Sequence, residues 1–117
     1  MRILMQTRPI TVAETHIFTR QAEKIWSDAE LSVLVDHPAH NPEDGDLIPG
    51  TGGIRKIRWG KAGTGKRGGV RVIYFYHNAD MPLYLLLAYA KAQATDLTQD
   101  EKRTLTALVA ALKQGKG

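Results

Sequence analysis

Cysteine is absent from the 117 residues of this chain. The chain therefore has no disulfide, no thiolate metal site and no cysteine nucleophile, and it suits a reducing compartment. Long apolar runs are also lacking. The longest, Pro82–Ala90 (PLYLLLAYA), is far shorter than the roughly 20 residues of a membrane-spanning helix, and the apolar patch in MRILMQTRPI is too short for a signal peptide. We expect a cytoplasmic protein that makes no contact with a membrane.

Acidic residues are missing from one long segment of the chain. Between Leu47 and Ala79 there is no Asp or Glu, and the same segment holds seven of the sixteen basic residues. The other nine basic residues are outnumbered by twelve acidic ones, so this segment carries the whole net charge of +4. A solvated surface usually mixes both signs. A block of one sign favours a polyanionic partner, and nucleic acid in particular.

The N-terminal third predicts a strand followed by two helices. β-branched residues predict the strand over Ile10–Phe18, and apolar spacing predicts a helix over Thr19–Trp26. The capping box SDAE predicts a second helix that begins at Asp28 and ends at Pro38. The two helical segments form either a hairpin or one kinked helix. The leader Met1–Pro9 is compatible with a flexible segment or with an added edge strand.

The rest of the chain predicts further strands and one last helix. The expected elements are a loop over His37–Gly53, strands over Ile54–Trp59, Val70–His77 and Leu83–Lys91, a turn at Asn78–Asp80, and a helix that starts with the capping box at Thr98 and Glu101. The order strand-helix-helix-strand-strand-strand-helix predicts an α+β fold. In it, an antiparallel sheet carries an N-terminal helical hairpin and a C-terminal helix, within a single domain over residues 1–117.

The stretch Gly60–Gly69 (GKAGTGKRGG) matches the G-x-x-x-x-G-K pattern of a nucleotide-binding loop. Such a loop needs Ser or Thr after the lysine and a helix that begins there. Here Arg67 follows Lys66, and a β-rich segment comes next. The stretch is therefore predicted to be a flexible connection between two strands that carries Lys61, Lys66 and Arg67.

Alternation along the strands places basic side chains on defined faces. Lys56 and Arg58 share one face of their strand. Arg71 is a lone cation in an apolar strand, where a buried charge is costly unless it is paired. It either pairs with a carboxylate such as Asp80 or Glu30, or faces a cleft and binds phosphate with its forked guanidinium. The flanking residues carry no acid, which favours phosphate binding.

Three stretches, taken in order, resemble the RelE/HigB-like toxins of type II toxin–antitoxin modules, in the RelE/ParE superfamily. They are PEDGDLIPGTGGIRKIRW, GKRGGVRVIYFY and LLLAYAKAQATDLTQDE. The resemblance covers Ile10–Leu112 and is greatest for the HigB-type branch, with its G-T-G-G-[LI]-R-K-x-R signature. It implies a RelE-like fold with the order of elements predicted above. It also implies a ribosome-dependent endoribonuclease, or mRNA interferase, that cuts mRNA in the ribosomal A site without metal or cofactor and so inhibits translation.

The resemblance also implies the partners of the chain. A cognate antitoxin, in this branch usually a helix-turn-helix protein, neutralises the toxin by protein–protein contact. The pair represses its own operon, so the toxin reaches operator DNA only through the antitoxin. The ribosome and mRNA are the other expected partners.

Metal-free RNA cleavage assigns roles to the basic residues. The ribose 2′-OH attacks the phosphate, which requires a base, cations for the phosphorane-like charge and an acid for the 5′-oxygen. By resemblance, Lys56 and Arg58 are the strand cations and Arg71 grips the scissile phosphate. Lys56 is the candidate base, provided that neighbouring cations favour its neutral form. His77 is the candidate acid, with an ordinary surface histidine as the alternative.

Other residues are expected to bind the substrate. Tyr89 is a candidate to stack on a base, with a core aromatic as the alternative. The candidate substrate-binding residues are Arg55, Lys61, Lys66, Arg67, Tyr89 and Lys91. His37 and His40 are three residues apart, a spacing too common to predict a metal site.

Departures from the family pattern leave alternatives open. Many members have a second basic residue directly after the position of Lys91, where this chain has Ala92, and some have a tyrosine in the last helix, which this chain lacks. The general acid is therefore left open between His77 and another group. The alternatives are a ParE-like inhibitor of DNA gyrase, a non-catalytic nucleic-acid-binding module, and a decayed toxin that still binds its antitoxin.

Overall fold

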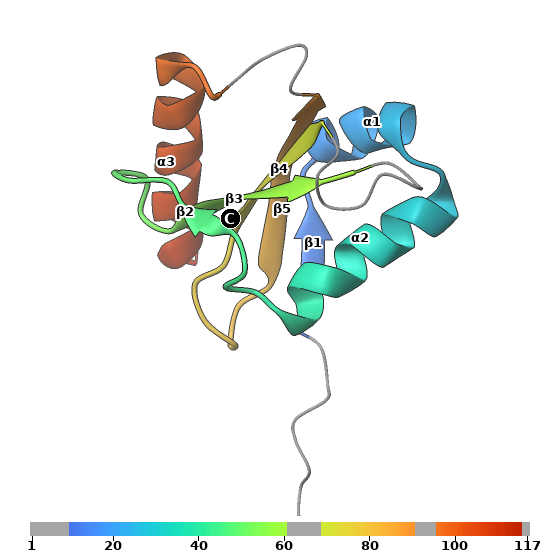
Figure 1. Ribbon diagram of the computed structural model, residues 1–117. Helices are drawn as coiled ribbons and strands as arrows, with labels where there is room; N and C mark the ends of the chain where they lie inside the picture. The colour runs from blue at the N-terminus through green and yellow to red at the C-terminus, as the bar shows by residue number, and fades with distance from the viewer. Residues whose placement is uncertain (1–9, 61–68, 91–95, 116–117) are drawn as a thin grey trace, which may run out of the picture.

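The computed structural model describes residues 10–60, 69–90 and 96–115. Its elements in chain order are β1 (Val12–Glu14), α1 (His16–Ile25), α2 (Asp28–His40), β2 (Asp46–Leu47), β3 (Ile54–Trp59), β4 (Val70–Phe75), β5 (Leu83–Ala90) and α3 (Gln99–Lys113). The strands form one sheet in the order β1-β5-β4-β3-β2. Helices α1 and α2 cover one face and α3 covers the other, as Figure 1 shows. The predicted α+β class is confirmed.

The sheet is mixed rather than purely antiparallel. β1 lies parallel to β5, with Val12 opposite Leu83, while the other neighbouring strands run antiparallel. β1 and β5 can run parallel because a long connection separates them in the chain, and it includes both helices and the other strands. The structure also contains a short strand that was not predicted. This strand, β2, lies within the segment predicted as a loop and pairs Asp46 with Lys56.

The first strand is shorter than predicted: of Ile10–Phe18 only Val12–Glu14 is strand, and the helix expected from Thr19 already begins at His16. Helix α1 begins there because the Thr15 side chain accepts a hydrogen bond from the Phe18 amide at 3.0 Å. This cap satisfies one of the free N–H groups at the start of a helix. Phe18 is then fully buried on the inner side of α1. Local capping and burial thus override the β propensity of the residues.

Two separate helices form the predicted hairpin. The Ser27–Glu30 capping box is present at the start of α2, and the extended backbone at Trp26 separates it from α1. The predicted end at Pro38 is wrong, since α2 continues to His40. Proline near the end of a helix removes a single hydrogen bond, and Pro38 is itself buried against the core. His37 and His40 therefore lie on the last turn of α2 rather than in a loop.

An apolar cluster fills each side of the sheet. The cluster below α1 and α2 is centred on Phe18, Leu34 and Tyr74, all fully buried. The cluster below α3 joins Ile73 and Phe75 to a stripe on that helix. The buried stripe residues are Leu105, Val109 and Leu112. None of the helices in the described part of the chain is long and apolar enough to cross a membrane.

The N-terminal cap and the middle of α1 form hydrogen bonds with β5 at and near a bulge in that strand. The register between β4 and β5 shifts at Ile73 and Tyr74, which leaves Leu86 without a partner in the ladder. The Thr15 hydroxyl donates a hydrogen bond to the Leu86 carbonyl, and the Gln21 amide oxygen accepts one from the Ala88 N–H, both at 2.8 Å. The threonine thus satisfies a backbone carbonyl at the bulge, and the glutamine satisfies an amide of β5 beyond the last residue that pairs with β1. Beyond the bulge, β4 and β5 resume regular pairing.

Candidate functional site

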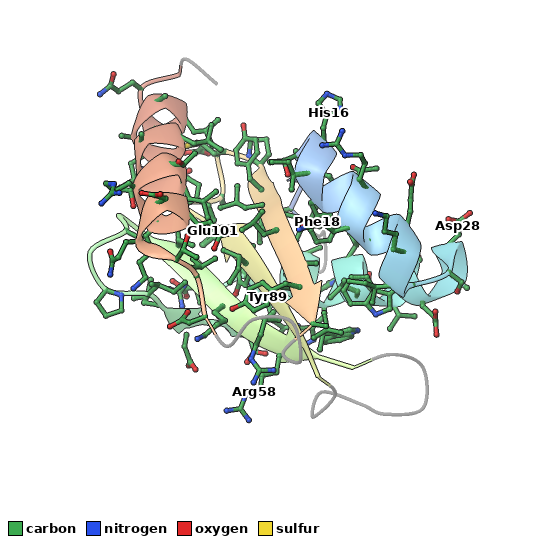
Figure 2. All side chains as sticks on the ribbon, turned by 90° about the horizontal axis from the view of Figure 1, so that it is seen from above. His16, Phe18, Asp28, Arg58, Tyr89 and Glu101 are labelled. Atoms are coloured by element: carbon green, nitrogen blue, oxygen red, sulfur yellow. The ribbon has the colours of Figure 1, made fainter. Side chains whose placement is uncertain are left out.

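Three polar side chains form a row across the central strands. Arg58 on β3 lies directly opposite Arg71 on β4, and Arg71 lies directly opposite Tyr89 on β5. Residues paired in this way project from the same face, with Cβ atoms about 4.5–5.5 Å apart. The face is the one covered by α3, because Tyr89 packs against the apolar cluster below that helix. Figure 2 shows Arg58 and Tyr89 at the same end of the sheet.

Arg71 is buried in this row. Its side chain is 8% exposed, and within the described residues no carboxylate forms an ion pair with it. Of the two carboxylates considered as partners, Asp80 lies in the turn after β4 and Glu30 lies in the capping box of α2. Pairing with either is not observed. A buried guanidinium without a carboxylate is costly, and a bound anion offsets that cost.

Lys56 lies on the same face of β3 as Arg58, and these two side chains together with Arg71 form a cationic surface. Lys56 also has an acidic neighbour. Its Nζ lies 3.6 Å from Oδ1 of Asp96, the residue that leads into α3. The pKa of Asp96 is lowered, first by the hydrogen bond from the Leu97 amide and then by the charges of Lys56 and Lys102. Sequence reasoning did not assign Asp96 to the site. The residue belongs to the TDLT stretch noted in the resemblance, but nothing in the sequence pairs it with a strand forty positions earlier.

A cleft of about 330 Å³ opens beside this cationic surface. Its lining consists of Asp44, Asp46, Lys56, Ile57, Arg58 and Arg71. The two aspartates precede the acid-free segment, and the fold brings them to its edge. Asp46 lies opposite Lys56 in the ladder. Within residues 10–60, 69–90 and 96–115, no three His, Asp or Glu side chains gather in a way that could hold a metal ion.

Of the two alternatives for Tyr89, the structure shows the core aromatic. Its ring packs against the core below α3, as an ordinary core aromatic does. Its hydroxyl is buried and has no hydrogen-bond partner in the described part of the chain. Burial, and then the charge of Asp96, raise the pKa of Tyr89, while Arg71 acts in the opposite direction. The hydroxyl therefore stays protonated at neutral pH and can donate a hydrogen bond to an anion.

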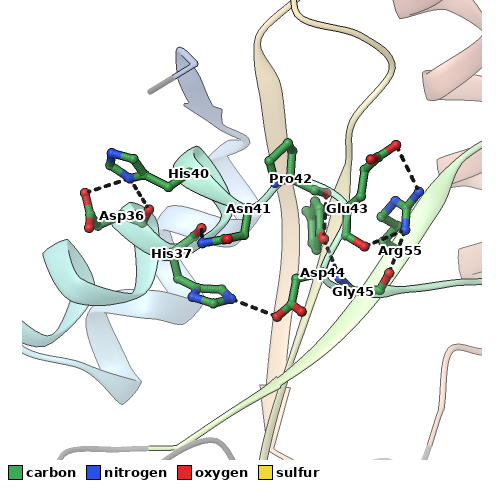
Figure 3. A network of polar contacts seen from close by, with 10 residues as sticks. Asp36, His37, His40, Asn41, Pro42, Glu43, Asp44, Gly45 and Arg55 are labelled. Carbon is green, nitrogen blue, oxygen red and sulfur yellow. Dashed lines mark hydrogen bonds and ion pairs between the residues drawn. The ribbon is translucent and has the colours of Figure 1, made fainter. Parts of the chain in front are cut away.

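Arg55 lies on the other face of β3 and does not join the row. Its Nη1 donates hydrogen bonds to the carbonyls of Glu43 and Gly45 at 3.0 and 2.8 Å, as drawn in Figure 3. The Tyr74 hydroxyl donates to the Pro42 carbonyl at 2.9 Å and accepts from the Gly45 amide at 2.8 Å. Burial raises the pKa of Tyr74. Arg55 thus fixes the loop that carries the cleft aspartates, a positioning role.

Gly45 is required at this loop. A Cβ atom on Gly45 would lie 2.8 Å from the Tyr74 ring and hydroxyl, which is closer than real contacts allow. The adjacent Asp44 is held by His37, whose Nε2 lies 2.8 Å from Oδ2 of the carboxylate (Figure 3). The His37 ring also contacts Trp59, with 5.3 Å between ring centroids. The end of α2 therefore holds in place one of the aspartates that line the cleft.

His77 is not brought together with the row. It is exposed and lies beyond the end of β4, six residues from Arg71 along an extended chain, or about 20 Å. Its ring stacks on Phe75, with 6.2 Å between centroids. The remaining candidates, Lys61, Lys66, Arg67 and Lys91, lie outside the described residues.

Comparison with known families shows which family this fold belongs to. Residues 10–116 match the family model described as the RelE toxin of the RelE/RelB toxin–antitoxin system. The match begins two residues before β1 and ends three residues after α3, and so includes every described element. Toxins of such systems have an antitoxin as partner, and RelE toxins generally inhibit translation. The chain belongs to the RelE toxin family.

Proposed function

We propose that this toxin is a ribosome-dependent endoribonuclease of the HigB-type branch, which cuts translated mRNA in the A site by attack of the ribose 2′-OH. The observation that carries the proposal is the Arg58–Arg71 pair. Like charges directly opposite each other destabilise a sheet, and one of these two arginines is buried as well. An arrangement that costs stability is expected where it serves binding or catalysis.

The row matches the charge that develops in RNA cleavage. When the 2′-oxygen bonds to phosphorus and the bond to the 5′-oxygen breaks, negative charge accumulates on the phosphoryl oxygens. Two guanidinium groups fixed on adjacent strands can bind those oxygens through paired N–H groups, and prearranged donors of this kind lower the barrier. The Tyr89 hydroxyl, without a partner among the described residues, adds a neutral donor.

Lys56 serves best as a third cation. Its Nζ lies 3.6 Å from the Asp96 carboxylate and is engaged in an ion pair there, whereas a base must have its lone pair free for the 2′-OH proton. We therefore assign Lys56 to stabilisation of the phosphoryl charge in place of proton abstraction. His77 stands too far from the row to protonate a 5′-oxygen held there, so the proton donor and acceptor are left to groups outside the row.

Substrate binding is expected to extend beyond the row. In the sequence, Lys61, Lys66 and Arg67 fall between β3 and β4, a few residues from Arg58 and Arg71. Lys91 is the residue after β5 and is two positions from Tyr89. We propose that these side chains bind neighbouring phosphates, a contact that carries affinity without sequence preference.

A cell-free translation assay tests the proposed activity. A defined mRNA is incubated with the protein, with and without ribosomes, and the transcript ends are mapped by primer extension. Cuts that occur only on translated mRNA are expected. If the mRNA stays intact and protein synthesis continues, the proposal is contradicted, and a supercoiling assay with DNA gyrase then tests the ParE-like alternative.

A further inference from the structure

Asp96 is a carboxylate beside the cations of the candidate site, as are the cleft aspartates Asp44 and Asp46. Phosphate binding does not explain its place there. Asp96 reaches Lys56 on the face that carries Arg58 and Arg71, and its charge also acts on Tyr89. A carboxylate in such a place repels the phosphates of RNA. Asp96 is therefore expected to weaken substrate binding, and this cost suggests that the carboxylate serves another step of the reaction.

Asp96 is held in place by its own surroundings. Its Oδ1 accepts a hydrogen bond from the Leu97 amide at 2.8 Å, and the same oxygen faces Lys56. Thr98 follows and caps α3 by accepting a hydrogen bond from the Glu101 amide at 3.0 Å. The helix is anchored to the sheet by its buried stripe. The carboxylate is thus a fixed point supplied by the start of α3.

Lys56, in contrast, carries a long side chain that is free to adopt many rotamers unless it is held. It is partly exposed and projects from β3 at the edge of the cleft. Fixing a lysine side chain in one rotamer costs conformational entropy. If that cost is met before RNA arrives, the ammonium is already in place when charge develops on the phosphate.

We propose that Asp96 is a positioning residue that holds the Lys56 ammonium at the rim of the cleft, beside Arg58 and Arg71, at the expense of RNA affinity. The inference rests on the proposed endoribonuclease function and deepens it. Asp96 does not touch the RNA in this scheme, and its effect on cleavage passes through Lys56.

The decisive variant is Asp96→Asn, which keeps the shape and the oxygen that accepts from Leu97 but removes the charge. Cleavage is measured on ribosomes programmed with a defined mRNA, and kcat and KM are separated. The expected result is a kcat at least 10-fold lower with a KM that is unchanged or lower, because a repulsive charge is gone. A kcat that is unchanged or higher overturns the proposal.

A matched control is Asp100→Asn. Asp100 is also an exposed aspartate at the start of α3, but it pairs with Arg103 on the same helix. The substitution changes net charge by the same amount, and kcat is expected to stay within twofold of the wild type. An equal fall of kcat in both variants would assign the effect to net charge or to α3, against the proposal.

The route through Lys56 is tested by combining variants. In a Lys56→Gln background, Asp96→Asn is expected to cause no further loss of kcat, since there is no ammonium left to position. A full additional loss shows that Asp96 acts by another route and contradicts the proposal. Thermal unfolding of each variant confirms that the comparison is made on folded protein.

A labelling experiment keeps the outcome separate from the fate of the proposed function. Trace acetylation with acetic anhydride, read by mass spectrometry, is expected to modify Lys56 several-fold faster in Asp96→Asn than in the wild type, with exposed Lys24 as internal reference. Equal rates overturn the positioning role whether or not RNA is cut. Absence of cleavage by the wild type, in contrast, contradicts the proposed function alone.

Discussion

Two neighbouring rows of the same three strands have opposite characters. Ile57, Val72 and Ala88 form an apolar row that faces α1 and α2. The residues directly adjacent to these in each strand are the two arginines and the tyrosine of the candidate site, and they lie on the opposite face. Because side chains alternate along a strand, one short segment of sheet can supply core on one face and a charged surface on the other. Stability and activity are therefore expected to separate between adjacent residues.

The largest effect is expected on activity, from Arg58→Ala. Removing one donor that stabilises developing charge typically slows a reaction about 100- to 1,000-fold. The exposed side chain of Arg58 contributes little to the core, so the free energy of unfolding should change by less than about 0.5 kcal/mol. Cleavage rates and urea denaturation measure the two quantities. If Arg58→Ala is strongly destabilised but its folded fraction keeps full activity, the two rows do not separate activity from stability.

The adjacent residue should show the reverse. Ile57 is 7% exposed in the core below α1 and α2. Ile57→Ala should lower the free energy of unfolding by about 2–5 kcal/mol, because it removes apolar burial and leaves a cavity. Ile57 also lines the cleft but carries no group that binds phosphate, so the folded fraction should still cleave at close to the wild-type rate. Urea denaturation together with cleavage at low temperature checks this, and a catalytic defect in fully folded protein would count against it.

Two buried tyrosine hydroxyls extend the comparison to single polar atoms. The Tyr74 hydroxyl has two backbone partners, whereas the Tyr89 hydroxyl has none among the described residues. Tyr74→Phe should therefore destabilise the fold by about 1–3 kcal/mol, while Tyr89→Phe should be neutral or slightly stabilising and should slow cleavage. Thermal unfolding of both variants gives the answer. Equal destabilisation by the two would show that the Tyr89 hydroxyl has a structural partner.

The smallest effect concerns acid stability and Asp96. The folded protein lowers the pKa of Asp96 below its value in the unfolded chain. The carboxylate therefore adds stability above the unfolded pKa, and that stability is lost as pH falls through the folded pKa. In Asp96→Asn this contribution is absent at every pH. The drop in urea midpoint between pH 7 and pH 3 should be slightly smaller than in the wild type, and an identical drop would argue against the effect.

Much of the fold follows from local signals that tertiary structure leaves intact. The strand over Ile54–Trp59 was predicted with its observed bounds, and both capping boxes, at Ser27 and at Thr98, start helices as expected. The signals that failed were overridden by specific contacts. The β-branched residues after Thr15 became helical because that threonine caps α1, and Pro38 did not stop α2 because it is buried near the helix end.

The candidate site was predictable only within each strand. Alternation placed Lys56 with Arg58, and the isolated charge of Arg71 marked it as unusual. Which arginine faces which depends on the strand register, and the sequence does not define it because Gly60–Gly69 carries no specific turn signal. Asp96 joins the site only through the docking of α3, a long-range contact without a local signal.

The account depends most on the buried arginine of the row. The most direct test is the rate at which Arg71→Ala cuts translated mRNA, compared with Arg20→Ala, which removes the same charge from an exposed position on α1. The account predicts that Arg71→Ala, folded and with antitoxin binding intact, loses at least 100-fold in cleavage rate while Arg20→Ala cleaves like the wild type. Cleavage at the wild-type rate by folded Arg71→Ala would contradict the assignment of the row as the active site.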